Sequence, residues 1–312
     1  MIIRIKKRKL ILALMLIVLS LPIAYAVASV VKVNFKVELV ISNRNPVINF
    51  TNATIGAVDP TAAGTTNVLI SFNVSDADGV NQINASTTVV NFTLGVNSQW
   101  YANVSAIASS EFGTCGNTTI SDIVVINCTV ALPYFVNASA NWVVNISVKD
   151  KIGGKGTNDT IRFTVNTISG LALPYTAINF SSVNVGQQNV LAYPHLLINN
   201  TGNDDFSRVN ISASALVGTT TTSENIAVTN FGVNTTNSSA NNRGAFPAGG
   251  VVALTDVNSG TFTTLNHGHT SDFAPNTDKG NISVFVWVNV PSSGLSPQLY
   301  NATWNVTATS SP

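Results

Sequence analysis

The residues with the clearest chemistry are asparagines in the pattern Asn-x-Ser/Thr, which occurs nineteen times in 312 residues. With 39 asparagines and 64 serines and threonines, random placement would give about eight such patterns. In exported proteins this asparagine is the acceptor of an N-linked glycan. Chance in an Asn/Thr-rich chain explains part of these nineteen patterns, but not the number above eight. The predicted glycosylation sites are Asn49, Asn52, Asn73, Asn84, Asn91, Asn103, Asn117, Asn127, Asn137, Asn145, Asn158, Asn179, Asn199, Asn210, Asn234, Asn237, Asn281, Asn301 and Asn305.

The middle residue of these sequons carries further information. In nine of them it is valine, isoleucine or phenylalanine, as in Asn145-Ile146-Ser147. A β-strand points successive side chains to opposite faces. The asparagine and the hydroxyl residue then share the outer face, and the apolar middle residue enters the core. We therefore expect many acceptors on sheet faces as well as in loops.

Two other groups could in principle bind metal ions. His267 and His269, with Asp272 nearby, offer transition-metal ligands, but in a Gly/Thr-rich loop a solvated turn is favoured over a metal site. Asp76 and Asp78 could contact Ca²⁺, but the further ligands of a calcium loop are missing, and a turn stabilised by aspartate side chains is favoured. We predict no metal and no cofactor.

The two cysteines, Cys115 and Cys128, form an even pair, which in an oxidising compartment predicts a disulfide bond. Cys128 shares one strand face with Val124, Ile126 and Val130, so it should point into the core. The alternative is two free buried thiols.

Catalytic signatures are missing from the sequence. There is no GxSxG setting, no HExxH and no phosphate-binding glycine loop, and fourteen acidic residues are scattered over the whole chain. An active site needs titratable groups that converge. We predict that the protein is not an enzyme, with a secreted hydrolase as the least favoured alternative.

The N-terminus has the order of an export signal. Five basic residues between Arg4 and Lys9 precede an uncharged apolar stretch, Leu10 to Leu21, and Pro22 is followed by small residues suited to cleavage. We predict a signal peptide at residues 1–28, with an uncleaved membrane anchor as the alternative. Residues 29–312 then carry ten basic and fourteen acidic side chains, a net charge of −4, so binding to nucleic acid is not expected.

The rest of the chain predicts an all-β fold. Period-2 segments alternate with Gly, Pro, Asn and Asp clusters, and no helical period is found after residue 30. The length suits two immunoglobulin-like β-sandwich domains in tandem after the N-terminal hydrophobic helix. We place them at residues 43–168 and 169–312, and we predict a long loop-rich insertion at 217–280 in the second domain.

Residues 29–42 form a separate N-terminal strand in this scheme. Apolar residues alternate with mostly polar ones from Val31 to Ile41. Such a strand could complete the sheet of a neighbouring subunit, and head-to-tail repetition would give an open filament. The alternative, which the sequence favours, is an ordinary first strand within its own domain.

Two segments of the first domain resemble known surface proteins. VLISFNVSDADGV at residues 68–80 resembles the early strands of bacterial-type immunoglobulin-like and PKD-like domains. VVNISVKDKIGG at 143–154 resembles their closing hairpin. The resemblance covers most of the domain and implies a spacer or structural module.

The second domain carries similar signals. INFSSVNVGQ at 178–187 and LLINNTGN at 196–203 resemble the opening of extracytoplasmic sandwich domains. VNVP at 288–291 and YNATWNV at 300–306 are similar to closing strands of archaeal and bacterial cell-wall domains. Similarity to the WxL wall-binding family covers only these last residues and lacks the proximal tryptophan motif, so wall binding is not carried over.

Together, leader, sequons and paired sandwiches resemble an archaeal surface glycoprotein of the S-layer or pilus type. The resemblance implies a secreted structural subunit of the cell surface. Its expected partners are N-linked glycans and copies of itself or other envelope proteins, with the membrane contacted through the leader alone. The alternative function is an adhesin that binds through residues 217–280.

Overall fold

The structure is a computed structural model, and the part of the chain that it describes ends at residue 310. The described residues are 34, 36–50, 55–95, 102–105 (backbone only), 113–237, 244–255, 262–268 and 280–310. The chain divides into two compact units, Met1–Ser42 and Asn43–Pro312. The predicted signal peptide at residues 1–28 lies outside the described residues. Within those residues, no helix has the length and apolar character needed to span a membrane.

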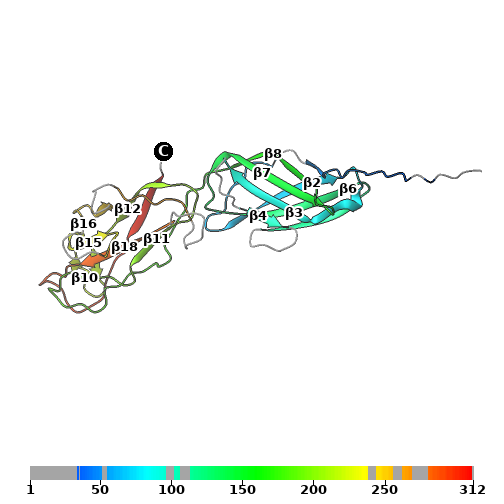
Figure 1. Cartoon of the computed structure of the whole chain (residues 1–312). Helices are drawn as coiled ribbons and strands as arrows, with labels where there is room; N and C mark the ends of the chain where they lie inside the picture. The colour runs from blue at the N-terminus through cyan, green and yellow to red at the C-terminus, as the bar shows by residue number, and fades with distance from the viewer. Residues whose placement is uncertain are drawn as a thin grey trace, which may run out of the picture. The chain divides into compact units, whose positions relative to one another are not determined.

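The first half of the larger unit contains two antiparallel four-stranded sheets (Figure 1). The first sheet has the order β1 (Val47–Phe50), β2 (Thr65–Ser75), β6 (Ile123–Pro133) and β5 (Gly113–Ile120). The second has the order β4 (Ala102–Ser105), β3 (Ile83–Leu94), β7 (Ser139–Asp150) and β8 (Lys155–Val165). A short 3₁₀ turn, Val80–Gln82, precedes β3.

The two sheets share one hydrophobic core, which makes them a β-sandwich. Strand alternation explains its composition. On β7 the buried set is Trp142, Val144, Ile146 and Val148, as the sequence predicted. Trp142 is fully buried, its ring lies 6.1 Å from that of Phe163, and its Nε1 donates to the carbonyl of Asn137 at 2.9 Å.

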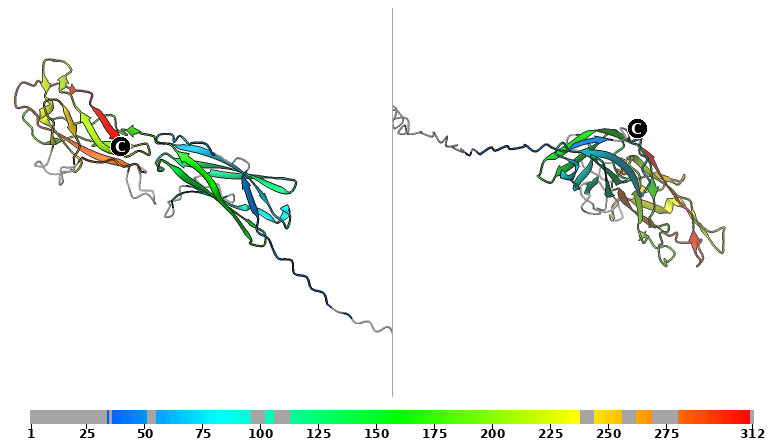
Figure 2. Two further views of the ribbon diagram at one scale, coloured as in Figure 1. Left: turned by 90° about the horizontal axis from the view of Figure 1, so that it is seen from above. Right: turned by 90° about the vertical axis from the view of Figure 1, so that its right-hand side faces the viewer.

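The second half has shorter strands, drawn in yellow-green to red in Figure 2. One sheet has the order β16 (Gly244–Ala245), β15 (Phe231–Asn234), β18 (Asn281–Val288), β11 (Leu196–Asn200) and β9 (Leu171–Ala172), and β10 (Val190–Leu191) also pairs with β18. A second sheet consists of β17 (Val251–Ala253), β12 (Phe206–Ser212) and β20 (Asn305–Ser310). A small third sheet consists of β14 (Asn225–Ile226), β13 (Leu216–Gly218) and β19 (Tyr300–Asn301), and a 3₁₀ turn spans Val228–Asn230.

These sheets enclose a second hydrophobic core, separate from the first. All regular strands of the described residues pair antiparallel, and no α-helix occurs among them. The expected all-β fold with β-sandwich architecture is confirmed. The expected N-terminal helix lies outside the described residues.

For residues 217–280, the sequence predicts a loop-rich insertion punctuated by short strands such as 251–254. Its described parts contain strands that belong to the sheets, since β15 pairs with β18 and β17 pairs with β12. They also supply core side chains, among them Phe231, Phe246, Leu254 and Leu265. Of these strands, only β17 is predicted from the sequence, because strands of two to four residues are too short to give a clear period-2 pattern.

The predicted strand at 31–41 also differs from the structure. Its described residues, 34 and 36–41, belong to no strand. Val37, Leu39, Val40 and Ile41 are all more than 70% exposed, and Lys36 contacts Glu38. A strand requires a partner for its backbone N–H and C=O groups, and these residues have no strand partner within the described chain. The described part of the segment therefore does not form the favoured alternative, a first strand within its own domain.

Removal of the Trp142 side chain should lower the free energy of unfolding of the first sandwich. We expect Trp142→Ala to cost about 3–5 kcal/mol, because the indole fills the core and a cavity would remain. Asn141→Ala, at an exposed neighbouring position, should change stability little. Urea denaturation followed by circular dichroism measures both, and equal effects of the two variants would contradict the assignment of Trp142 to the core.

Candidate functional site

The sequon asparagines on long strands lie on outward sheet faces. On β7, Asn145 and Ser147 are half-buried at the surface, while Ile146 between them is in the core. The same arrangement holds on β2 for Asn73 and on β3 for Asn91, whose middle residues Val74 and Phe92 are fully buried. Alternation thus places the amide and the hydroxyl side by side outside the core.

Exposure differs widely among the sequons. Among the described sites, the exposed asparagines are Asn49, Asn117, Asn127, Asn179, Asn237, Asn301 and Asn305, and the half-buried ones are Asn73, Asn84, Asn91, Asn137, Asn145, Asn158, Asn199, Asn210 and Asn281. Asn234 differs from the expectation of an outward site because it is only 4% exposed, and its Oδ1 accepts hydrogen bonds from Thr236. Asn52 and the side chain of Asn103 lie outside the described residues.

The predicted disulfide bond between Cys115 and Cys128 is present. The two residues stand directly opposite each other on β5 and β6. Cys128 is buried and points into the core with Ile126 and Val130, as expected. Closing a loop of this length contributes about 3 kcal/mol by restricting the unfolded chain. The bond links β5 to β6, its neighbour in the sheet.

Asp76 and Asp78 form the predicted aspartate-stabilised turn. Oδ1 of Asp76 accepts a hydrogen bond from the backbone N–H of Asp78 at 2.8 Å, and Gly79 follows with a φ of 111°. Oδ2 of Asp78 accepts from the N–H of Arg44 at 2.7 Å, so the turn also holds the segment that enters β1.

His267 is held by two side chains. Its Nδ1 lies 2.6 Å from Oδ1 of Asp205, and its Nε2 lies 2.6 Å from Oδ1 of Asn137. Its predicted companions His269 and Asp272 lie outside the described residues. Within the described ranges, no three His, Cys, Asp or Glu side chains gather as a metal-binding group.

The sequence analysis did not identify the polar network around Glu224. The carboxylate accepts hydrogen bonds from the hydroxyl groups of Ser296 and Tyr300, from the backbone N–H of Ser296 and from Nε2 of Gln298, at 2.5–2.8 Å. The Ser296 hydroxyl, followed by the other donors, lowers the pKa of Glu224 to about 2. No sequence signal could reveal this network, because its partners lie more than seventy residues away.

This network has the chemistry of a structural clasp. Every partner is neutral and donates a hydrogen bond to the carboxylate. None of these partners loses a proton to Glu224, so the network does not produce a general base or a nucleophile. Ser296 and Gln298 precede β19, and Tyr300 is its first residue, while Glu224 directly precedes β14. Strands β14 and β19 lie on either side of β13 in the small sheet. The carboxylate therefore ties the two outer strands of that sheet together.

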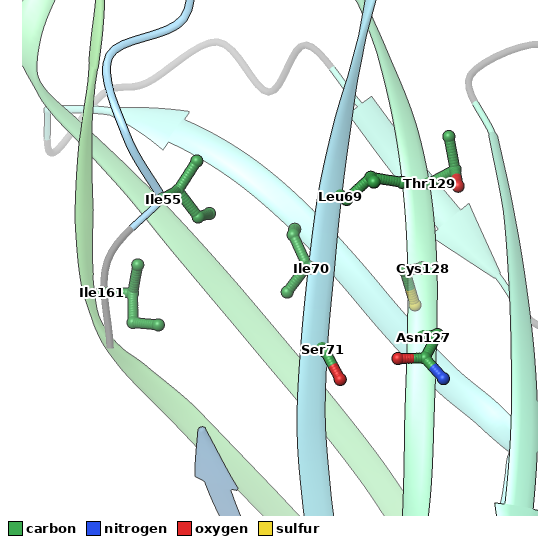
Figure 3. A pocket seen from close by; sticks show the side chains of 8 residues that line it. All are labelled: Ile55, Leu69, Ile70, Ser71, Asn127, Cys128, Thr129 and Ile161. Atoms are coloured by element: carbon green, nitrogen blue, oxygen red, sulfur yellow. The ribbon is translucent and has the colours of Figure 1, made fainter. Parts of the chain in front are cut away.

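One cavity in the first sandwich has a volume of about 420 Å³. It is lined by Ile55, Leu69, Ile70, Ser71, Asn127, Cys128, Thr129 and Ile161. Figure 3 shows Ile55 and Ile161 on one side and Ile70 of β2 between them and β6. None of these eight side chains is a free titratable group, since Cys128 is in the disulfide bond. The lining mixes apolar side chains with the polar Ser71, Asn127 and Thr129 and offers no acid or base.

Comparisons with known proteins give no family. No family model and no curated protein matches the chain. Among solved structures, a GspB Siglec domain is similar over 46% of this chain and 68% of its own, with 15% identity and a TM-score of 0.28. A structure titled as the chaperone-tip adhesin complex of CFA/I fimbriae biogenesis is similar over 85% of this chain and 84% of its own, with 12% identity and a TM-score of 0.29. Neither likeness is close enough to carry an argument about function.

The Glu224 clasp predicts a pH dependence of stability. The folded pKa of about 2 lies below the ordinary value of 4.5, so the stabilisation is complete above pH 4.5 and is lost as the pH falls towards 2. We expect Glu224→Gln to lower the melting temperature at pH 7 and to flatten the decline between pH 4.5 and 2. Thermal denaturation across this range, with the exposed Asp122→Asn as control, tests the expectation. Parallel pH profiles of Glu224→Gln and the parent protein would contradict it.

Proposed function

We propose that the protein is an exported, N-glycosylated structural component of the cell surface and not an enzyme. The observation that carries the proposal is the placement of exposed sequon asparagines on the outer faces of strands: on β1 and β6 the middle residues Phe50 and Cys128 pack in the core, while Asn49 and Asn127 are exposed. Glycans on such faces would block sheet stacking and edge pairing. The disulfide bond supports an oxidising, extracytoplasmic location.

The low charge of the chain agrees with this role. Charged residues make up 9% of the sequence, and Asn, Ser and Thr supply most of its polar groups. A catalytic site would need converging titratable groups. Among the described residues, the most strongly perturbed carboxylate, Glu224, is fully engaged in holding strands together.

The intact mass of the protein purified from its native envelope tests the glycoprotein part. We expect a mass well above the 32.7 kDa of the full polypeptide, which falls to the polypeptide mass after chemical deglycosylation. A native mass equal to that of the bare polypeptide, with or without residues 1–28, would overturn this part of the proposal.

Within this role, we propose that residues 31–41 join subunits into filaments. The described part of this segment is exposed and unpaired by any strand, and its apolar side chains Val37, Leu39 and Ile41 alternate with Glu38 and Val40. An added strand of this kind gains backbone hydrogen bonds from the edge it joins and pockets for alternate side chains.

Deletion of residues 31–41 should abolish filaments seen by electron microscopy and leave the circular dichroism spectrum unchanged. Replacement of Val37, Leu39 and Ile41 by threonine should have the same effect, because it removes the apolar face and keeps β-propensity. Lys36→Ser with Glu38→Ser, which keeps that face, should still assemble. Filaments formed by the deletion variant would exclude this mode of assembly.

A further inference from the structure

The sequon asparagines face one another across strands. This happens in three different sheets, between partners that are far apart in the sequence. The register places Asn49 opposite Asn73, Asn91 opposite both Asn103 and Asn145, and Asn199 opposite Asn281. Side chains that are directly opposite have Cβ atoms about 4.5–5.5 Å apart on the same face. Two glycosylated asparagines in such a pair would have to share the same space above the sheet.

In each set one asparagine is packed between its neighbours. Oδ1 of Asn73, Asn91 and Asn199 is buried and accepts no hydrogen bond from the described residues. Each of the three lies on an interior strand, namely β2, β3 and β11. The three side chains are half-buried, whereas those of Asn49 and Asn127 are exposed, so less of each is open to an enzyme that transfers a glycan.

The amide of Asn145 shows how these sets are organised. Its Nδ2 donates to Oγ1 of Thr93 at 2.6 Å. Thr93 is the hydroxyl residue of the sequon that begins at Asn91. In the folded sheet, the hydroxyl of the Asn91 sequon therefore accepts a hydrogen bond from the amide of Asn145 on the neighbouring strand. Asn91 itself lies between two further asparagines.

Asn127 provides the contrast within the same sheet as Asn73. It also lies on an interior strand, β6, but its cross-strand neighbours are Ser71 and Gly116. Asn73 instead lies between Asn49 and Val125. Asn127 is exposed, whereas Asn73 is half-buried with a hidden oxygen. In this sheet, the asparagine with small cross-strand neighbours is therefore the exposed one, although both asparagines lie on interior strands.

We propose that Asn73, Asn91 and Asn199 are silent sequons that stay unmodified in the mature protein, while open sequons such as Asn127 and Asn49 carry the glycans. This inference rests on the proposed function, because it assumes that the chain is glycosylated. In the transfer, the anomeric carbon of an oligosaccharide leaves its phosphate-linked donor and bonds to Nδ2, which gives up one proton to the released phosphate. At a silent site, the sugar would have to displace an opposing asparagine on a flanking strand.

Site-resolved mass spectrometry of glycopeptides from the native full-length protein tests the proposal. We expect glycan on Asn127 and none on Asn73, Asn91 or Asn199. Glycan on Asn73 at the level of Asn127 would overturn the inference and leave the proposed function standing. A chain with no glycan at any site would overturn both.

Two reciprocal variants test the cause. Gly116→Val adds bulk beside Asn127, in a place where a Cβ atom meets nothing within 4 Å, and should remove most of the glycan from Asn127. Asn49→Ala combined with Val125→Ala should open Asn73 and make it a glycan site. Thr118→Val, on the same strand and face as Gly116 but opposite Val125, should leave Asn127 modified.

Folding of each variant is checked by the retained Cys115–Cys128 bond and the circular dichroism spectrum. A folded Gly116→Val protein with full occupancy at Asn127 would exclude neighbour size as the cause. Failure of the double variant to gain glycan at Asn73 would exclude it as well.

Discussion

The two-residue repeat of the β-strand is the constraint on which this molecule depends. Because successive side chains point to opposite faces, a tripeptide with a large apolar centre and two polar ends satisfies the core and the surface together. Ile146, Val74 and Phe92 are such centres, and each is buried. Each of these tripeptides thus supplies a core side chain and an outward asparagine at once. Fold and surface chemistry therefore cannot vary independently in this chain.

Pairing of strands adds a second level to this constraint. The antiparallel register sets the neighbours of every outward asparagine, and these come from distant parts of the sequence, as for Asn199 and Asn281. A pattern that is local in sequence therefore acquires a non-local environment. The Glu224 clasp follows the same principle, because a single carboxylate collects donors that only the folded sheet brings together.

Long amphipathic strands could be predicted from the sequence, and residues without a periodic context could not. The buried face of β7 and the inward direction of Cys128 follow from alternation alone. The core positions of Phe231, Phe246, Leu254 and Leu265 do not, because each lies in or beside a strand of at most four residues or in a loop. For the N-terminal segment, the sequence predicted a strand that its described residues do not form. Its alternation is clear, but a strand also needs a pairing partner, which the pattern cannot supply.

For the candidate site, the sequence predicted which asparagines could be acceptors but not how accessible each would be. Asn73 and Asn127 have equally good sequons on neighbouring strands, yet their neighbours are Asn49 and Val125 in one case and Ser71 and Gly116 in the other. Accessibility is a property of the register, which depends on free-energy differences summed over whole sheets. A tripeptide pattern carries no information about it.

Few contacts between two charged side chains hold the described residues together, and this determines how the stability of the protein responds to salt. Within the described part of the chain, Lys36 contacts Glu38, His267 shares a hydrogen bond with Asp205, and the Glu224 clasp uses uncharged donors. Dissolved salt weakens attraction between exposed charges but has little effect on apolar packing or on hydrogen bonds between neutral groups. The folded domains should therefore keep their stability in dilute water and in brine alike.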